Sequence, residues 1–384
     1  MTTKTCIVGM GISLIAATAT VAQYWKPQPG RPACYRRPID LVICLDTSGS
    51  MTGLLDSARA RLWDIVNQLG RARPTPSLRI GLLTYGSPRG SSAHDGWVIQ
   101  QSNLTTDLDT VYAKLMTLTT DGGNEYVGWV LHDALRTMSW SSDPSALKMI
   151  FVAGNESADQ GQDAFNFRYV AEEARAAGII INAIYCGNNR QGTSERWHEV
   201  ASHGGGSYSA IDMQCGTAQI TTPYDQQLMD LNKKLNDTYV AYGAKGEAGR
   251  QNQQAQDANA ERLGRQSCGA RVTAKAQSVY TNGGWDLVDA ADAAGFKLEQ
   301  VSASDLPPNM QSMPIAERQA YIDGMRRARE AVRQEINEVG ATRDRFLETE
   351  QKKTSSGAVG LDAAMLGAIR EQAQAKGFSF DSGC

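Results

Sequence analysis

Short apolar runs alternate with segments of helical spacing along the first part of the chain. The first run, Leu41 to Leu45, has a length that is typical of a buried strand of an α/β sheet. Residues 54–69 carry an apolar side chain at every third or fourth position, as one face of a helix does. A buried strand followed by an amphipathic helix predicts an α/β domain.

The pattern changes beyond residue 243. Residues 244–266 are polar, rich in Gln and Ala, and compatible with a solvated helix or a stiff connector. Residues 322–346 carry apolar side chains at mixed three- and four-residue spacing, with Arg329 and Arg343 on the same seam. This favours a helical hairpin or a short coiled coil, and packing onto the first domain is preferred over a free zipper. We therefore expect residues 244–384 to be mainly helical.

The N-terminus has the pattern of an export signal. Lys4 precedes an apolar run of small residues, and Thr20 and Ala22 form a small-x-small cleavage pattern. Residues 1–22 are interpreted as a signal peptide or an N-terminal anchor, and the proline-containing residues 23–38 as a linker. We expect the protein to be exported to the periplasm, to the cell surface or as a secreted protein.

The net charge and the cysteine spacing bear on nucleic-acid binding, zinc binding and disulfide formation. The net charge of −3 gives no basic field for nucleic acid. No cysteine lies in a C-x-x-C pair, which disfavours zinc. Cys44 lies inside the first apolar run and is expected to be a buried free thiol. Cys186 and Cys215 are expected near the ends of neighbouring strands, where a disulfide between them is possible.

A cluster of oxygen donors follows the first apolar run. Asp46 ends the run, and Ser48 and Ser50 follow at alternate positions before the helical segment. In open α/β sheets, ligands bind at the carboxyl ends of strands. One carboxylate and two hydroxyl groups suit Mg²⁺, or alternatively Mn²⁺ or Ca²⁺. The alternative is a turn in which Ser48 or Ser50 caps the helix.

The stretch IDLVICLDTSGSM, which begins at Ile39, resembles the opening of the von Willebrand factor type A (vWA) domain and its metal-ion-dependent adhesion site (MIDAS). The resemblance continues through DGGNEYVGWVLHDAL at Asp121 and LKMIFVAGNE at Leu147, and spans residues 39–243. It implies a doubly wound, mostly parallel six-stranded sheet of the Rossmann-like kind. The motifs look like a branch found in bacterial extracytoplasmic proteins.

Two further loops supply metal ligands in that family, and both depart from its pattern here. Register against the following helix puts Glu125, with Asn124 beside it, where the family usually has Thr. Gly154 stands where the family has Asp, and Asn155 and Glu156 follow it. The resemblance thus implies a site of Asp46, Ser48, Ser50, Glu125 and Asn155, with Asn124 and Glu156 behind it. The alternative for Glu125 is a carboxylate that only begins a helix.

The resemblance implies binding rather than catalysis. In family members the metal keeps one position for an acidic residue of another protein. We therefore expect a non-enzymatic adhesion or scaffold protein that engages a partner through a divalent cation. Two alternatives remain: a metal-independent scaffold acting through the C-terminal helices, and a metal-dependent hydrolase.

Overall fold

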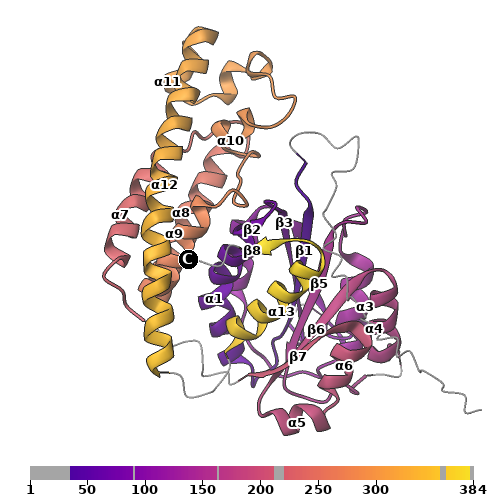
Figure 1. Ribbon diagram of the computed structural model, residues 1–384. Helices are drawn as coiled ribbons and strands as arrows, with labels where there is room; N and C mark the ends of the chain where they lie inside the picture. Colours follow the sequence, from indigo (N-terminus) through magenta and orange to yellow (C-terminus); the bar gives the residue numbers. More distant parts are fainter. Residues whose placement is uncertain (1–34, 90, 162–163, 212–219, 355–359, 381–384) are drawn as a thin grey trace, which may run out of the picture. The chain divides into compact units, whose positions relative to one another are not determined.

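The computed structural model in Figure 1 describes residues 35–89, 91–161, 164–211, 220–354 and 360–380. Its central sheet has six strands in the order β4-β3-β1-β5-β6-β7. All neighbouring pairs are parallel except β3 and β4. This confirms the predicted fold class. The strands are β1 (Pro38–Asp46), β3 (Ser77–Tyr85), β4 (Ile99–Thr105), β5 (Leu147–Gly154), β6 (Ile179–Cys186) and β7 (Gly205–Ile211).

Helices cover both faces of the sheet. Successive side chains of a strand point to opposite faces, so a strand that is apolar throughout needs cover on both. On β1, Leu41 and Ile43 belong to one buried cluster, whereas Val42 and Cys44 belong to the other. Cys44 is a buried free thiol, as predicted. The first cluster includes side chains of α1 (Thr52–Gly70) and α2 (Leu108–Thr117). The second includes side chains of α3 (Val127–Thr137), α4 (Phe167–Ala176) and α6 (Trp197–Gly204); the short α5 (Asn189–Ser194) precedes α6.

The last helix of the chain returns to the sheet. α13 (Leu361–Ala375) contacts α1 and the strands β5, β6 and β7. Gln372 of α13 and Asn182 of β6 are buried and exchange amide hydrogen bonds of 2.6 and 3.1 Å. Beyond α13, β8 (Ser379–Phe380) pairs antiparallel with β2 (Ala72–Arg73). The C-terminal segment therefore packs on the central sheet and adds one strand to a separate two-stranded sheet.

The helix that directly follows the last strand of the sheet packs elsewhere. The sequence predicts that the sheet domain ends with a helix over residues 224–239. The structure has this helix as α7 (Asp225–Asn236), but α7 packs mainly on α9 (Arg265–Ala276) and α12 (Ile315–Thr354). Its apolar face, with Leu228, Leu231 and Leu235, is satisfied by those helices. Where the domain ends stays a prediction, although the structure shows that α13 contacts β5, β6 and β7.

The C-terminal region is mainly helical, as predicted. In addition to α7, α9, α12 and α13 it contains α8 (Gly246–Leu263), α10 (Leu287–Ala291) and α11 (Pro308–Gln311), with 3-10 turns at Leu298–Gln300 and Ala303–Asp305. Side chains of α7, α9, α13 and the middle of α12 share one buried cluster with α1 and the sheet, whereas α10, α11 and the start of α12 form a separate cluster. Arg36–Cys384 form one compact unit. The division at residue 243 stays a prediction, although the two regions share this core.

The two arginines on the α12 seam are buried anchors. Arg343 donates from Nε to Asp225 Oδ1 at 2.9 Å, and Arg329 donates from Nη1 to Asp286 Oδ2 at 2.7 Å. Both guanidinium groups are almost fully buried. Because α12 packs on α7, α9 and α10, the seam faces helices of the same chain. This packing gives the coiled-coil alternative no support.

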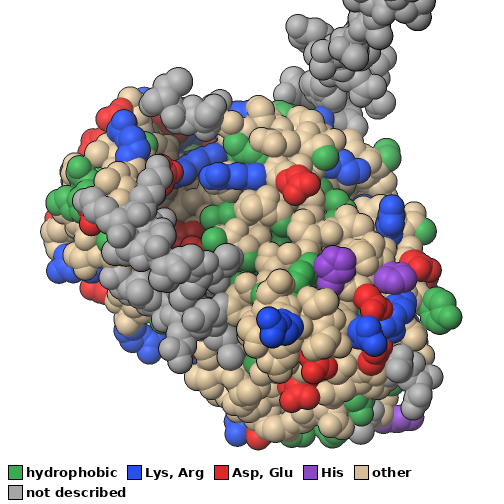
Figure 2. Space-filling model, turned by 60° about the horizontal axis from the view of Figure 1, so that its bottom comes forward, with side chains coloured by type: hydrophobic (Ala, Val, Ile, Leu, Met, Phe, Trp, Pro, Cys, Tyr) green, Lys and Arg blue, Asp and Glu red, His purple; other side chains and the backbone are tan. Residues whose placement is uncertain are grey.

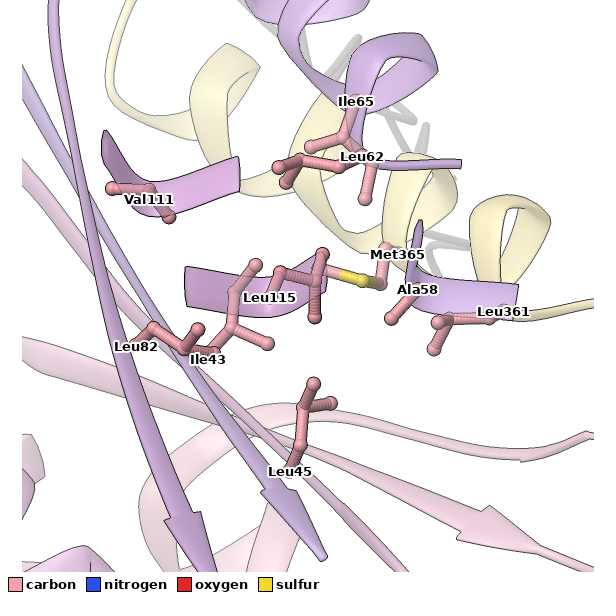
Figure 3. Close-up of a pocket in the computed structure, with 10 residues that line it drawn as sticks. All are labelled: Ile43, Leu45, Ala58, Leu62, Ile65, Leu82, Val111, Leu115, Leu361 and Met365. Atoms are coloured by element: carbon pink, nitrogen blue, oxygen red, sulfur yellow. The ribbon is translucent and has the colours of Figure 1, made fainter. Parts of the chain in front are cut away.

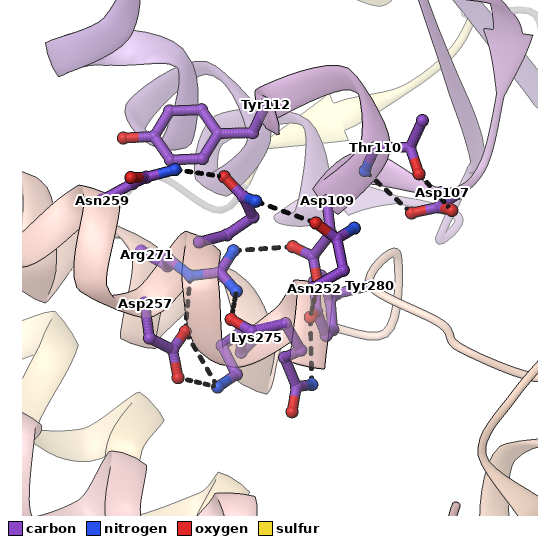
Figure 4. Close-up of polar contacts among 12 residues, drawn as sticks. Asp107, Asp109, Thr110, Tyr112, Asn252, Asp257, Asn259, Arg271, Lys275 and Tyr280 are labelled. Carbon is purple, nitrogen blue, oxygen red and sulfur yellow. Dashed lines mark hydrogen bonds and ion pairs between the residues drawn. The ribbon is translucent and has the colours of Figure 1, made fainter. Parts of the chain in front are cut away.

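A second polar cluster ties the sheet domain to the helices (Figure 4). Arg271 of α9 donates to Asp109 of α2 at 2.7 Å and to Asp257 of α8 at 2.6 Å. Lys275, one turn along α9, donates to Asp257 at 2.9 Å, and the Tyr280 hydroxyl donates to Asp109 at 2.6 Å. Arg271 and Lys275 are fully buried, so the charges of this cluster depend on one another.

Packing between α1, α2, α13 and the sheet leaves a small apolar cavity of about 20 Å³ (Figure 3). Leu361 and Met365 of α13 form one wall, and Ile43 and Leu45 of β1 form the opposite one. Every side chain that lines the cavity is apolar, which is typical of a dry packing defect. Among the described residues, no helix is long and apolar enough to cross a membrane. The predicted signal peptide at residues 1–22 lies outside the described residues.

Candidate metal centre at the carboxyl edge of the sheet

The D-x-S-x-S motif lies where β1 ends and the turn to α1 begins. The parallel register pairs Asp46 with Tyr85, the last residue of β3. The Ser48 backbone N–H donates to Asp46 Oδ1 at 2.7 Å and folds the turn over the carboxylate. Asp46 and Ser48 are buried, whereas Ser50 is exposed and its Oγ lies 3.4 Å from Ser48 Oγ. The turn therefore sets a buried carboxylate beside hydroxyl groups that lead to the surface.

Neither serine acts as a helix cap. The N-cap position of α1 is Met51, and no side chain accepts a hydrogen bond from the first turn of the helix. The alternative that Ser48 or Ser50 caps α1 is therefore wrong. Their hydroxyl groups remain directed to the same small region as the Asp46 carboxylate, as a metal-binding turn requires.

Glu125 joins Asp46 from the loop before α3. Its side chain is 4% exposed, and its carboxyl group lies within hydrogen-bonding reach of Asp46. Gly86, with a φ of +82°, closes the other side: a Cβ there would lie 2.6 Å from Asp46 Oδ1. Asn155, just after β5, donates from Nδ2 to Ser50 Oγ at 3.0 Å. The structure thus brings together the five predicted ligands, Asp46, Ser48, Ser50, Glu125 and Asn155.

The two residues predicted to stand behind the ligands have different places. Asn124 is exposed and donates to the Tyr126 hydroxyl at 3.2 Å, so its amide is engaged away from the carboxyl pair. Glu156 is exposed and accepts from Gln160 Nε2 at 2.9 Å. Gln160 also accepts from the Glu125 backbone N–H at 3.3 Å. Gln160 links the two loops, and no motif in the sequence pointed to it.

The electrostatics of the pair favour a positive partner. Burial raises the pKa of Asp46 well above its ordinary value, and the adjoining Glu125 raises it further. Burial also raises the pKa of Glu125, although interactions with Asp46 and Ser48 oppose that shift. Two adjoining buried carboxyl groups cannot both be charged without compensation, so they share a proton unless a cation takes its place.

Two buried carboxylate oxygens at this position lack hydrogen-bond partners and would fit a hard divalent cation. Asp46 Oδ2 and Glu125 Oε2 are buried and have no hydrogen-bond partner. Buried polar atoms are rarely left unpaired in this way. Carboxylate, hydroxyl and amide oxygens are the donors that Mg²⁺, Mn²⁺ and Ca²⁺ prefer. Among the described residues no group of three or more His, Cys, Asp or Glu could hold a metal. A cation here would depend on two carboxylates and neutral oxygens.

Tyr85 explains why this site has no carboxylate from β5. The Tyr85 hydroxyl donates to the Ala153 carbonyl at 3.0 Å and fills the space beside Gly154. A Cβ at Gly154 would overlap this hydroxyl and would lie 3.1 Å from the Trp197 ring. The sequence indicated that Asp is missing at residue 154. It did not indicate that Tyr85 fills the space there, because Tyr85 lies on a different strand.

Substitution of Gly154 by Ala is expected to lower the free energy of unfolding by about 1–3 kcal/mol, because the new methyl group overlaps a packed hydroxyl. In Tyr85→Phe that hydroxyl is absent. We therefore expect the double variant to lose less stability than the sum of the two single losses, by at least about 0.5 kcal/mol. Urea unfolding of the four proteins measures this coupling. Strictly additive losses would mean that Tyr85 does not close the Gly154 position.

The predicted disulfide stays a prediction. Cys186 ends β6 as a buried free thiol, and burial raises its pKa well above the ordinary value. Its predicted partner Cys215 lies outside the described residues.

Acidic and basic side chains are mixed on one face of the molecule. α5, which follows β6 directly, lies at the bottom of Figure 1, and Figure 2 brings this bottom forward. On the face that Figure 2 shows, acidic and basic side chains are interspersed and form no large field of one sign. This distribution gives no support to nucleic-acid binding.

Comparison with known families identifies the domain that carries this site. Residues 40–219 match the von Willebrand factor type A domain. The match confirms the family that the motifs around Asp46 indicated, for the part of the chain that holds the sheet. The VWA domain thus supplies β1, Asp46 and the loop that carries Glu125, whereas α7 to α13 lie beyond the matched residues.

The solved structures that match this chain have low sequence identity to it. Proximal thread matrix protein 1 from the mussel byssus, with a zinc-occupied MIDAS motif, is 15% identical over 47% of this chain and 43% of its own, with a TM-score of 0.37. The SpRpn10 VWA domain is 15% identical over 46% of this chain and 88% of its own (TM-score 0.35). The pilus adhesin SpaC from Lactobacillus rhamnosus GG is 14% identical over 46% of this chain and 28% of its own, with a TM-score of 0.35.

The aligned region thus spans less than half of the mussel protein. No curated protein matches the chain. What the chain binds is accordingly a matter of proposal.

Proposed function

We propose that this chain is an exported, non-enzymatic adhesion or scaffold protein whose VWA domain binds another protein through a divalent cation. Mg²⁺ is the first candidate, with Mn²⁺ or Ca²⁺ as alternatives. The observation that carries the proposal is the pair of buried, unpartnered oxygens, Asp46 Oδ2 and Glu125 Oε2. Export is supported by the N-terminal sequence alone, with Lys4 before an apolar run.

The ligands have a graded exposure that suits a bound partner. Asp46 and Glu125 form the buried floor, whereas Ser50 is exposed and Asn155 is half-buried. A cation held on this floor would attract oxygen donors from the solvent side, and a carboxylate is the strongest of these among side chains. An exposed Asp or Glu of another protein is therefore the partner group that we propose, in agreement with the family resemblance.

Calorimetric titration of Mg²⁺ and Mn²⁺ into the protein is expected to give saturable binding that Asp46→Ala abolishes. The variant removes one of two carboxylates, and a ligand loss of this kind weakens metal affinity by at least about tenfold. Asp230→Ala, which removes an exposed carboxylate of α7, serves as the control and should bind as the original protein does. Equal binding by all three proteins would show that the cation binds elsewhere.

A peptide array tests the proposed partner group. Peptides with Asp or Glu are expected to bind in Mg²⁺ and to release on chelation, whereas the matched Asn or Gln peptides should bind in neither condition. A metal-independent scaffold would ignore the chelator and lose its partner when residues 322–346 are deleted. A hydrolase would show turnover in a broad phosphatase screen.

A further inference from the structure

A cleft lies between α10 and α12, where several arginine side chains meet. The two helices contact each other and lie side by side in Figure 1. The cleft has a volume of about 320 Å³, at the lower end of the range of roughly 300–1,000 Å³ for small-molecule sites. Four of the side chains that line it are arginines of α12: Arg326, Arg327, Arg329 and Arg333. The cleft therefore has the size of a ligand site and the composition of an anion site.

Two of these arginines are neutralised by acidic residues at α10. Arg329 donates to Asp286 and to Asp289, at 2.7 Å in each case. Arg326 donates to Asp292 at 2.8 Å. These ion pairs hold α12 against α10 and leave little positive charge for a ligand.

The other two arginines are available to a ligand. Among the described residues, neither Arg327 nor Arg333 has a hydrogen-bond or ion-pair partner. Arg327 is exposed, whereas Arg333 is half-buried and its Nε is fully buried without an acceptor. Buried donors are rarely left unpaired in this way. Glu330, the remaining carboxylate of the cleft, is exposed and has no ion-pair partner among the described residues. The unpaired groups of the cleft thus have an excess of positive charge.

Two more buried donors without partners lie beside the same arginines: the Tyr239 hydroxyl and Asn282 Nδ2. The Arg329 guanidinium lies 4.2 Å from the centroid of the Tyr239 ring. Burial raises the pKa of Tyr239, and the charges of Arg329 and Arg333 oppose that shift, so both lie near its hydroxyl. The Asn282 backbone N–H donates to Asp289 Oδ2 at 2.8 Å. The metal centre has unpaired acceptors, whereas this region has unpaired donors, which call for an acceptor.

We propose that the cleft between α10 and α12 binds a phosphate monoester, with Arg333 and Arg327 as the donors to its phosphate group. A guanidinium group matches the oxygens of a phosphate in geometry as well as in charge. The cleft is larger than a single tetrahedral ion needs, and Val288 offers an apolar contact to an organic substituent. This inference goes beyond the proposed function, because the cleft lies outside residues 40–219 and involves no cation.

The test is a calorimetric titration of glycerol 3-phosphate and of inorganic phosphate into the full chain, at constant ionic strength in chloride. A chelator keeps the metal centre out of the measurement. We expect saturable binding of both, with the ester bound at least as tightly as the inorganic ion. Arg333→Gln is expected to weaken both by about tenfold or more, because charge-assisted hydrogen bonds are lost. Arg345→Gln, an equal change on an exposed part of α12, should bind as the original protein does.

A second variant is expected to act in the opposite direction. Glu330→Gln removes the unpaired negative charge of the cleft and should tighten phosphate binding several-fold. Thermal unfolding provides the control for folding. Without a ligand, Arg333→Gln should unfold at the temperature of the original protein, because the Arg333 Nε has no hydrogen bond to lose. The ester should raise the unfolding temperature of the original protein more than that of Arg333→Gln.

Three results would overturn the inference. The first is the absence of saturable binding by the original protein below about 10 mM. The second is equal affinity of the original protein, Arg333→Gln and Arg345→Gln, which would mean that the anion binds elsewhere. The third is binding of inorganic phosphate without the ester, which would show that the cleft holds a free ion and not a monoester.

Discussion

A chain that ends at Thr354 is expected to lose its cooperative fold. The deletion removes α13 and β8, so β5, β6 and β7 lose the helix that covers them. Leu361, Met365, Ile369 and Phe378 are at most 3% exposed, and each contributes about 1.5–3 kcal/mol by its burial. The sum of about 6–12 kcal/mol is as large as the whole stability of a typical domain. Asn182 would also lose its amide partner Gln372.

Far- and near-ultraviolet circular dichroism with thermal unfolding measures this effect. We expect retained helical signal, loss of the near-ultraviolet signal and no cooperative transition. Addition of a peptide of residues 360–380 should restore part of the transition, because it supplies the missing layer. A fragment of residues 39–243 is expected to fail for the same reason. A shortened chain that unfolds cooperatively near the original temperature would mean that α13 is a peripheral attachment.

Replacement of Asp257 by Ala is expected to lower the free energy of unfolding by about 3–5 kcal/mol. The substitution leaves Arg271 and Lys275 buried in α9 with one negative partner, Asp109, in place of two. Burial alone would raise the pKa of Asp257, but the charges of Lys275 and Arg271 outweigh it and hold this pKa well below the ordinary 3.8. The carboxylate therefore stabilises the folded state whenever it is charged.

The same pKa shift fixes the pH dependence. A group whose pKa is lower in the folded state contributes its stability above the ordinary value and loses it as the pH falls through the lowered value. Guanidinium unfolding measures the free energy of unfolding of the original protein and of Asp257→Ala. The difference between the two should have its full size at neutral pH and should shrink below about pH 4. Asp230→Ala removes an exposed partner of Lys233 on α7 and should change nothing measurable. Equal losses for both variants would show that the buried cluster contributes no more than a surface pair.

The sheet could be predicted because its signals are local. The apolar runs at Leu41, Leu78, Leu147 and Ile179 became β1, β3, β5 and β6, since a strand buried on both faces needs such a run. The partner of each amphipathic helix could not be predicted in the same way. α7 and α13 both carry an apolar face, and nothing in either pattern states which one covers β5 to β7.

In the metal site, too, the local features could be predicted and the contacts between distant segments could not. Asp46, Ser48 and Ser50 lie within five residues of one another after a strand, so the chain itself places them together. Glu125 could be placed by its register before α3, but its contact with Asp46 depends on the close approach of the loops at Gly86 and Gly123. No sequence motif indicated the roles of Tyr85 and Gln160, because each acts through a contact between segments that are distant in sequence.

We propose that a divalent cation binds between Asp46 and Glu125. Anomalous X-ray diffraction from crystals soaked in Mn²⁺ tests it most directly, because the signal locates the ion itself. We expect one strong peak beside Asp46 Oδ2 and Glu125 Oε2, with Ser48 and Ser50 as neighbours, and no such peak in Asp46→Ala crystals. A strong peak elsewhere, or none beside this carboxyl pair in the original protein, would contradict it.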